Sequence, residues 1–348
     1  MGTGILATLL QTYAATDPLR PAMGLHEAAI VLLVLAWVLL IGLSTGFVRH
    51  VRGDTGRGRA MVTDPATQPL WGTVAMGVLA VGAATVAVVP AVAPGATALA
   101  VDVSLWLWVM GTVLGTVTAV GFAVVIARGD AGEPSLVWGL PVVPPMVSAT
   151  VGAGLVTMLP RGSVTAFALL VVSAASFVMA LTLGLVVFSL GYHHHWRVAP
   201  VALAASASTW IPLGIVGQST AGAQALAAAA ATHLDAATSA QLHGLGVAYG
   251  VVALAVGVPL AGWAAVVTVR GFAGRMPFTT GWWALTFPVG TLALGLHHLG
   301  RAMRSGSVTD LGAGALVVLC GTWTLCAVAS ARAVLTQWRG ARPLSAGR

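Results

Sequence analysis

The stretch Trp282 to Thr291, WWALTFPVGT, places a proline and a glycine inside an apolar run that is long enough to cross a lipid bilayer. A helix that breaks inside hydrocarbon leaves backbone polar groups without their helical partners, and no water is there to replace those partners. The break must therefore face protein or a hydrated path rather than lipid. The stretch predicts a membrane-spanning helix with an interrupted centre, which is typical of a pore.

The composition predicts an all-α integral membrane protein. The 348 residues are 58% hydrophobic and only 7% charged, whereas roughly one residue in four is charged in soluble domains. Most apolar runs reach the length of about 20 residues that an α-helix needs to cross the hydrocarbon core. The net charge of +7 comes from arginines in short loops between the spans, which favours an orientation signal over nucleic-acid binding.

Apolar spans recur along the whole chain. They lie near residues 28–48, 70–91, 99–127, 137–159, 163–190, 199–227, 242–269, 281–300 and 311–337. The opening run, residues 1–14, is too short to cross a bilayer alone, so we interpret it as the later part of a truncated first helix. We expect about ten transmembrane helices in one transport domain over residues 1–340, followed by a short cytoplasmic tail at 341–348.

The arginines predict the orientation. With ten helices, most of them share one side of the membrane: positions 49, 52, 57, 59, 128, 197, 270, 275, 332, 339, 342 and 348. Only Arg20, Arg161, Arg301 and Arg304 fall on the other side. Because positive residues favour the cytoplasmic face, we expect a multi-pass protein of the plasma membrane with both termini in the cytoplasm.

Helix-breaking residues recur along the chain at a spacing of roughly seventy residues, as in a repeated structural unit. They are Gly2 and Gly4; Gly72 and Gly77; Pro141, Pro144 and Pro145; Pro212 and Gly214; and Pro288 and Gly290. This pattern predicts five helical hairpins, each with a broken inner helix and a plainer outer helix, arranged around a central pore. The alternative is that these small residues only allow the helices to pack closely.

Hydroxyl and amide side chains also occur on the interrupted helices. They are Thr3, Thr73, Ser148, Thr150, Ser206, Ser208, Thr209, Gln218, Thr286 and Thr291. Such groups can satisfy freed backbone positions or bind a dehydrated solute, so we expect them to line the path. Acidic residues are almost missing from the spans, which argues against a cation channel and favours a small anionic solute. Arg301 and Arg304 near one mouth would attract that anion, although they could instead only set the topology.

Three histidine and aromatic features carry further hypotheses. His297 and His298 lie near the outer end of the ninth helix and would make transport pH-sensitive, unless they are interfacial residues with local partners. Three consecutive histidines at positions 193–195 do not converge readily on one ion, so we expect no metal and no other cofactor. Phe287 stands directly before Pro288, where an aromatic side chain can block a narrow path or simply fill the core.

The sequence resembles the family of tellurite-resistance proteins and C4-dicarboxylate transporters, which includes fungal malate permeases, sulfite exporters and the slow-type anion channels of plant guard cells. The matching motifs are MGTGILA at residues 1–7 and WWALTFP at residues 282–288, on the first and ninth helices. The resemblance implies a pore within each subunit, assembly as a homotrimer, and a phenylalanine of the ninth helix that occludes the pore. Phe287 matches that position, and Phe278 is a weaker alternative. The family's first helix begins upstream of the first motif, so a missing half-helix would leave one side of the pore open.

We therefore expect transmembrane transport of small anions, such as malate, sulfite or related oxyanions, through a gated pore within the subunit. No enzymatic step is expected, and no glycine-rich phosphate-binding loop followed by Lys and Ser or Thr occurs in the sequence. Two alternatives remain open at this point. One is a non-conducting membrane scaffold or sensor, and the other is a membrane protein that holds haem through histidines.

Overall fold

The computed structural model describes residues 1–16, 24–53, 64 and 67–340, and these residues contain helices and no strand. The α-helices are α1 (Gly2–Thr16), α2 (Leu25–Gly53), α4 (Trp71–Val92), α5 (Thr97–Arg128), α6 (Val143–Val156), α7 (Val164–Arg197), α8 (Ile211–Ala230), α9 (Ala236–Ala273), α10 (Phe287–Ala302) and α11 (Gly306–Gly340). Five 3₁₀ segments join them: η2 (Gln68–Leu70), η3 (Pro94–Ala96), η4 (Leu136–Gly139), η5 (Leu203–Trp210) and η6 (Thr280–Leu285). The predicted tail, 341–348, lies outside the described residues.

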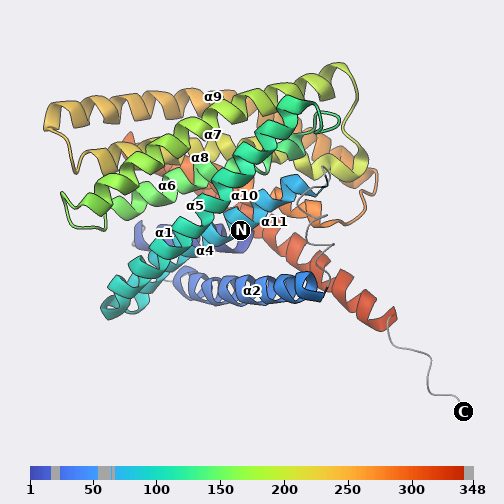
Figure 1. The fold of residues 1–348 in the computed structure, drawn as a ribbon, viewed down its shortest axis with the longest axis horizontal. Helices are drawn as coiled ribbons and strands as arrows, with labels where there is room; N and C mark the ends of the chain where they lie inside the picture. Colours follow the sequence, from blue (N-terminus) through green and yellow to red (C-terminus); the bar gives the residue numbers. More distant parts are fainter. Residues whose placement is uncertain (17–23, 54–63, 65–66, 341–348) are drawn as a thin grey trace, which may run out of the picture.

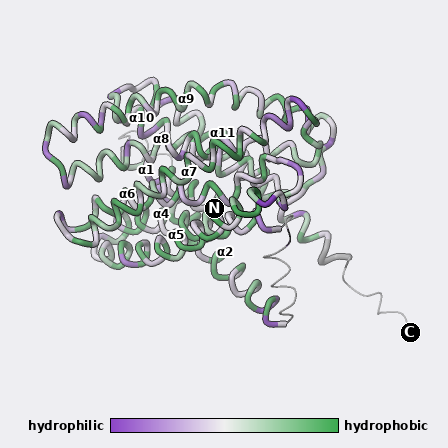
Figure 2. The backbone as a smooth tube through the Cα atoms, turned by 45° about the horizontal axis from the view of Figure 1, so that its top comes forward, coloured by the Kyte–Doolittle hydropathy of each residue, from purple (hydrophilic) through white to green (hydrophobic). Residues whose placement is uncertain are grey.

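The predicted membrane fold is confirmed. Every apolar span coincides with one long helix or with a 3₁₀ segment and the α-helix that follows it. Seven helical stretches among the described residues are long and apolar enough to cross a bilayer. In Figure 2 the hydrophilic segments gather mostly towards the ends of the helices, and the hydrophobic segments lie between them.

Consecutive helices form five hairpins, as the spacing of the helix breakers predicts. The contacting pairs are α1 with α2, α4 with α5, α6 with α7, α8 with α9, and α10 with α11. Because the two helices of a hairpin run in opposite directions, the first helices of all five hairpins run in the same direction. The first helix of each hairpin also contacts the first helix of the next.

The first helices form an inner layer and the second helices an outer one. The contacts run from α1 to α4, α6, α8 and α10 and return from α10 to α1, so the inner helices close a ring. In Figure 1, α7 and α9 lie along one side of the molecule and α2 along the other, with the inner helices between them. The most apolar window of η4 and α6 is 89% buried, whereas that of α9 is 17% buried. The outer helices therefore present their apolar side chains to lipid.

Four of the inner crossings share one local structure, a 3₁₀ segment followed by an α-helix. In α6, α8 and α10 a proline occupies one of the first two helical positions: Pro144, Pro212 and Pro288. Proline fits there because its ring fixes φ near the helical value, and its missing N–H would have no helical partner in the first turn. These prolines lie in the first turn of an α-helix that follows a 3₁₀ segment.

Candidate functional site

The breaks of the inner helices meet one another. Gly72, at the start of α4, packs on the backbone of Leu140 at the start of α6, so closely that a Cβ at Gly72 would collide with the Leu140 carbonyl. Gly139, at the end of η4, packs against the Phe188 ring of outer helix α7 and lies beside Ile211 at the start of α8, where a Cβ on the glycine would lie 3.0 Å from Ile211 Cγ2. These contacts connect the breaks of α4, α6 and α8.

The remaining contacts close the ring. A Cβ at Gly214 would lie 3.8 Å from Cγ of Pro288, which joins α8 to the break of α10. A Cβ at Gly290 would lie 2.9 Å from Cγ2 of Ile5, which joins α10 to α1. The circle closes between α1 and α4, where a Cβ at Gly4 would lie 2.7 Å from the carbonyl oxygen of Ala80, about two turns along α4. We call these meeting residues (2–5, 72, 80, 139–140, 211–214 and 286–290) the break ring.

Phe287 lies within the break ring. It is the first residue of α10, between the 3₁₀ segment η6 and Pro288. Its side chain is 3% exposed and belongs to the hydrophobic cluster that includes Ile5 of α1 and Val289. Thr286, the residue before it, is fully buried, and a Cβ at Gly2 would collide with its hydroxyl. A large aromatic side chain is therefore held at the level where α1 and α10 meet.

The hydroxyl groups predicted as pore lining make local contacts in the structure. The Ser148 hydroxyl lies 2.5 Å from that of Thr112, on outer helix α5, and the Ser148 carbonyl accepts the indole N–H of Trp108. Thr3 accepts the indole N–H of Trp323 on outer helix α11. Thr286 donates to the Trp283 carbonyl within its own segment. In this structure these hydroxyls connect inner helices to outer ones or stabilise the breaks.

Other predicted residues differ in how much space surrounds them. Pro144 and Pro145 are buried in the first turn of α6. Thr73 is half-buried and donates to the Leu70 carbonyl. A Cβ at Gly77, one turn further along α4, would meet no atom within 4 Å. Thr73 and Gly77 therefore mark the more open face of α4.

The electrostatics of the inner helices favour negative solutes. Helices α1, α4, α6, α8 and α10 contain no Asp, Glu or Lys. All five run in the same direction, and three of them carry a proline in their first turn: Pro212 and Pro288 in the break ring, and Pro144 just after it. The start of an α-helix carries partial positive charge, which stabilises nearby anions. The ring thus offers a neutral surface with several positive helix ends and no carboxylate.

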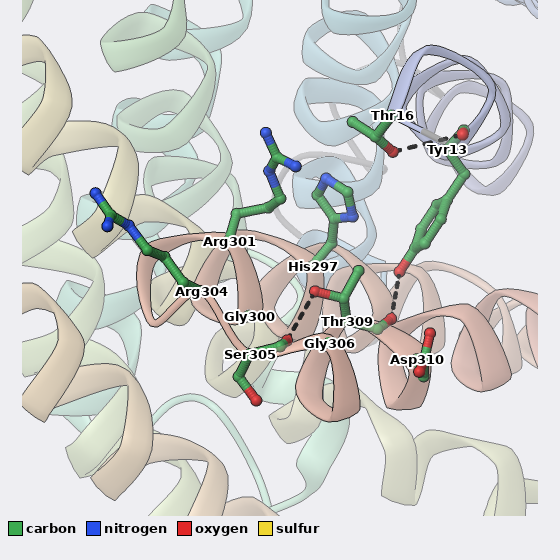
Figure 3. A pocket seen from close by; sticks show the side chains of 10 residues that line it. All are labelled: Tyr13, Thr16, His297, Gly300, Arg301, Arg304, Ser305, Gly306, Thr309 and Asp310. Carbon is green, nitrogen blue, oxygen red and sulfur yellow. Dashed lines mark hydrogen bonds between the residues drawn. The ribbon is translucent and has the colours of Figure 1, made fainter. Parts of the chain in front are cut away.

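A pocket of about 540 Å³ lies at the C-terminal ends of α1 and α10, away from the break ring, where α10 leads into α11. Its lining residues are Tyr13, Thr16, His297, Gly300, Arg301, Arg304, Ser305, Gly306, Thr309 and Asp310. We call it the arginine pocket. Figure 3 shows the side chains of Arg301, Arg304 and His297 on one side of the pocket and Asp310 away from them. Three of the four residues predicted to attract anions or respond to pH are thus brought together, whereas His298 does not line the pocket.

A tyrosine contact that the sequence did not predict forms one wall of the pocket. The Tyr13 hydroxyl donates to the Thr309 carbonyl at 3.3 Å, and the Tyr13 ring lies 4.7 Å from the His297 ring, centre to centre. His298 makes an edge contact with His297, with the two ring centres 5.9 Å apart. Gly312 makes room for the Tyr13 hydroxyl, since a Cβ there would lie 2.5 Å from the oxygen. The glycine is the one sequence signal for this contact.

No group of three His, Cys, Asp or Glu side chains suited to a metal ion occurs among the residues that the structure describes. Within the histidine run at 193–195, His194 has an acidic neighbour: its Nε2 lies 3.9 Å from a carboxylate oxygen of Glu133. Glu133 is almost fully exposed, so this pair lies at the protein surface.

Comparison with known proteins identifies relatives over nearly the whole chain. The family model of the voltage-dependent anion channel matches residues 1–331. The sulfite efflux pump SSU1 of Arthroderma otae is 27% identical over 334 residues, which cover 93% of this chain and 86% of that protein. Sulfite efflux pumps of Trichophyton rubrum and Arthroderma benhamiae are each 26% identical over the same coverage. No solved structure gives a significant match.

Proposed function

The chain belongs to the voltage-dependent anion channel family and carries small anions across a membrane, and we propose that the anion passes between the five inner helices of a single subunit. The observation that carries this proposal is the break ring. Interrupted helices are costly in a membrane unless their freed backbone groups face protein or water. Here the breaks of α4, α6, α8 and α10 lie at contacts between neighbouring inner helices, and α1 completes the ring, so the breaks are not scattered over the lipid-facing surface.

We propose small oxyanions as the substrates, with sulfite first and C4-dicarboxylates such as malate second. Sulfite is supported by the names of the three relatives. Dicarboxylates are supported by the motifs at residues 1–7 and 282–288. The absence of carboxylates from the inner helices favours both, because an embedded acidic group would repel them.

Phe287 is the proposed gate. Its ring is buried in the break ring, within the hydrophobic cluster that also contains Ile5 and Val289, so its displacement would open the path where α1 and α10 meet. A bulky apolar side chain in a narrow passage blocks ions sterically and also excludes water. Transport then requires movement of one side chain, with no covalent step and no nucleotide.

The proposed lining combines small and polar positions at and beside the breaks. Gly77 and Gly214 contribute backbone with little side-chain volume around it. Thr73 contributes a half-buried hydroxyl on the open face of α4. Such a lining can take part in partial dehydration of an anion without binding it tightly, which conduction requires.

The proposal also covers the membrane that holds the protein, its orientation there and its assembly. The arginine distribution supports a plasma-membrane protein with both termini in the cytoplasm. The family resemblance supports a homotrimer in which each subunit has its own path. The apolar outer helices can contact either lipid or a second subunit.

Ion selectivity in reconstituted vesicles tests the function. Purified protein should carry sulfite and malate down their gradients, and the reversal potential should follow the anion gradient. A reversal potential that follows the cation gradient would contradict the electrostatic argument. Absence of flux for every anion tested, in folded protein, would instead favour a scaffold or sensor.

A further inference from the structure

We propose that the arginine pocket is a docking site at which oxyanions bind before they enter the transport path, with Arg301 and Arg304 as its charged groups. The inference rests on the proposed function, because the pocket lies at the ends of two helices of the ring, α1 and α10. It assigns to the pocket a ligand class, small anions with two or more acceptor oxygens, and a preference for higher negative charge.

The two guanidinium groups of the pocket have no use elsewhere in the described part of the fold. Among the residues that the structure describes, neither Arg301 nor Arg304 makes a salt bridge or a side-chain hydrogen bond, and both are exposed. Asp310 lines the same pocket but does not pair with either arginine. A guanidinium presents several N–H donors in a planar fork, which suits the oxygens of a carboxylate or a sulfur oxyanion. The Ser305 hydroxyl lines the pocket beside them and has no hydrogen bond to the described residues.

The backbone at Arg304 provides a second, independent observation. Arg304 has φ +54°, in the left-handed region that glycine occupies without steric cost and other residues rarely adopt. It stands at the end of α10, in the turn where Ser305 N–H donates to the Gly300 carbonyl and Arg304 N–H donates to that of Arg301. Glycine is the usual residue at this position of such a helix end. An arginine is therefore present where the turn itself would favour glycine.

The chain contains a matched control for this feature. Arg275 is the other described non-glycine residue with positive φ, at +58°. It ends α9 in the same turn, since Met276 N–H donates to the Gly271 carbonyl and Arg275 N–H donates to that of Phe272. Helices α9 and α10 are consecutive and run in opposite directions, so Arg275 lies at the other membrane face and outside the arginine pocket. The same substitution at both positions changes charge and backbone equally and differs only in place.

The experiment compares Arg304→Gly with Arg275→Gly in the full chain, reconstituted in vesicles. The probes are formate, a monoanion with two acceptor oxygens, and malate, a dianion at neutral pH. Arg304→Gly removes one charge about 5 Å from the docked anion, in water-like surroundings. The half-saturating concentration should therefore rise about fourfold for a monoanion. It should rise about sixteenfold for a dianion, because the interaction energy doubles. Both effects should shrink as ionic strength rises. Arg275→Gly should leave both concentrations unchanged, and both variants should be at least as heat-stable as the wild type, because glycine suits the turn.

Binding can be measured without transport, which separates this inference from the proposed function. Sulfate should raise the melting temperature of the wild type and of Arg275→Gly, because a ligand of the folded state stabilises that state, and should raise it less for Arg304→Gly. If the wild type conducts and Arg304→Gly shows equal shifts for formate and malate, or the same shifts as Arg275→Gly, the docking site is wrong and the arginines only set orientation. If the wild type does not conduct but sulfate stabilises it through Arg304, the site stands and the transport proposal fails.

Discussion

Replacing Gly217 with alanine tests the helix crossing on which the ring depends most. Helix α8 meets α10 there. A Cβ at Gly217 would collide with the backbone of Thr291 and Leu292, and a Cβ at Gly295 would lie 2.6 Å from the Gly217 carbonyl oxygen. These neighbours are backbone atoms, which cannot rotate aside as a flexible side chain does. The two helices would have to move apart to accept even one methyl group.

The size of the effect follows from two opposing terms. Overpacking of a close-packed interior costs about 1–3 kcal/mol, and the backbone contacts place Gly217→Ala at the upper end. Alanine in place of glycine gains about 1 kcal/mol of helix propensity. We therefore expect a net loss of about 2 kcal/mol, which corresponds to a factor of about 30 in the ratio of folded to unfolded protein.

Thermal stability in detergent, followed by size-exclusion chromatography, measures this loss. The control is Gly321→Ala on outer helix α11, where a Cβ would meet no atom within 4 Å. This control gains helix propensity without a clash and should match or exceed the wild type. Equal stability of Gly217→Ala and Gly321→Ala would refute the close approach of α8 and α10.

Two further predictions concern polar contacts. Ser148→Ala should lower stability by about 1–3 kcal/mol, because it leaves the buried Thr112 hydroxyl without this partner, whereas loss of the exposed Thr324 hydroxyl should have little effect in the same melting assay. Asp235 caps α9 by accepting from the Thr238 backbone N–H and hydroxyl, and these hydrogen bonds lower the pKa of its carboxyl group. A lowered pKa in the folded state adds stability that is present above the unfolded pKa and is lost as pH falls through the folded one. Asp235→Ala should therefore reduce stability at neutral pH, and the difference from the wild type should diminish in acid; a constant difference would contradict the role of the charged cap.

The helices and their breaks could be predicted because their signals are local. Apolar length identifies a crossing within about 20 residues. A proline such as Pro288 fixes where a helix starts, since its ring and missing N–H act on adjacent residues. The spacing of such breaks then indicates five hairpins.

The direction in which a side chain points could not be predicted in the same way. The inner helices are apolar or small on every face, so periodicity does not distinguish the axis from the neighbouring helices. Ser148 was predicted to line the path, yet its hydroxyl meets Thr112 of an outer helix. Tyr13 contacts Thr309, which is 296 positions away, and no local pattern connects the two. Only the folded chain brings Tyr13, His297 and the two arginines to one pocket.

Anion flux through Phe287→Ala, compared with Phe278→Ala, tests the central claim most directly. Both variants lose the same aromatic group, but Phe278 lies outside the break ring and packs against Trp282. Truncating a buried phenylalanine can also destabilise the protein by about 3–5 kcal/mol, so flux is expressed per folded molecule. If Phe287 occludes the path, its removal should raise the flux of sulfite or malate on the order of tenfold, as the loss of a barrier of about 1.4 kcal/mol would do. Phe278→Ala should conduct like the wild type. Unchanged flux in folded Phe287→Ala, or the same increase in both variants, would contradict a path through the break ring gated by this residue.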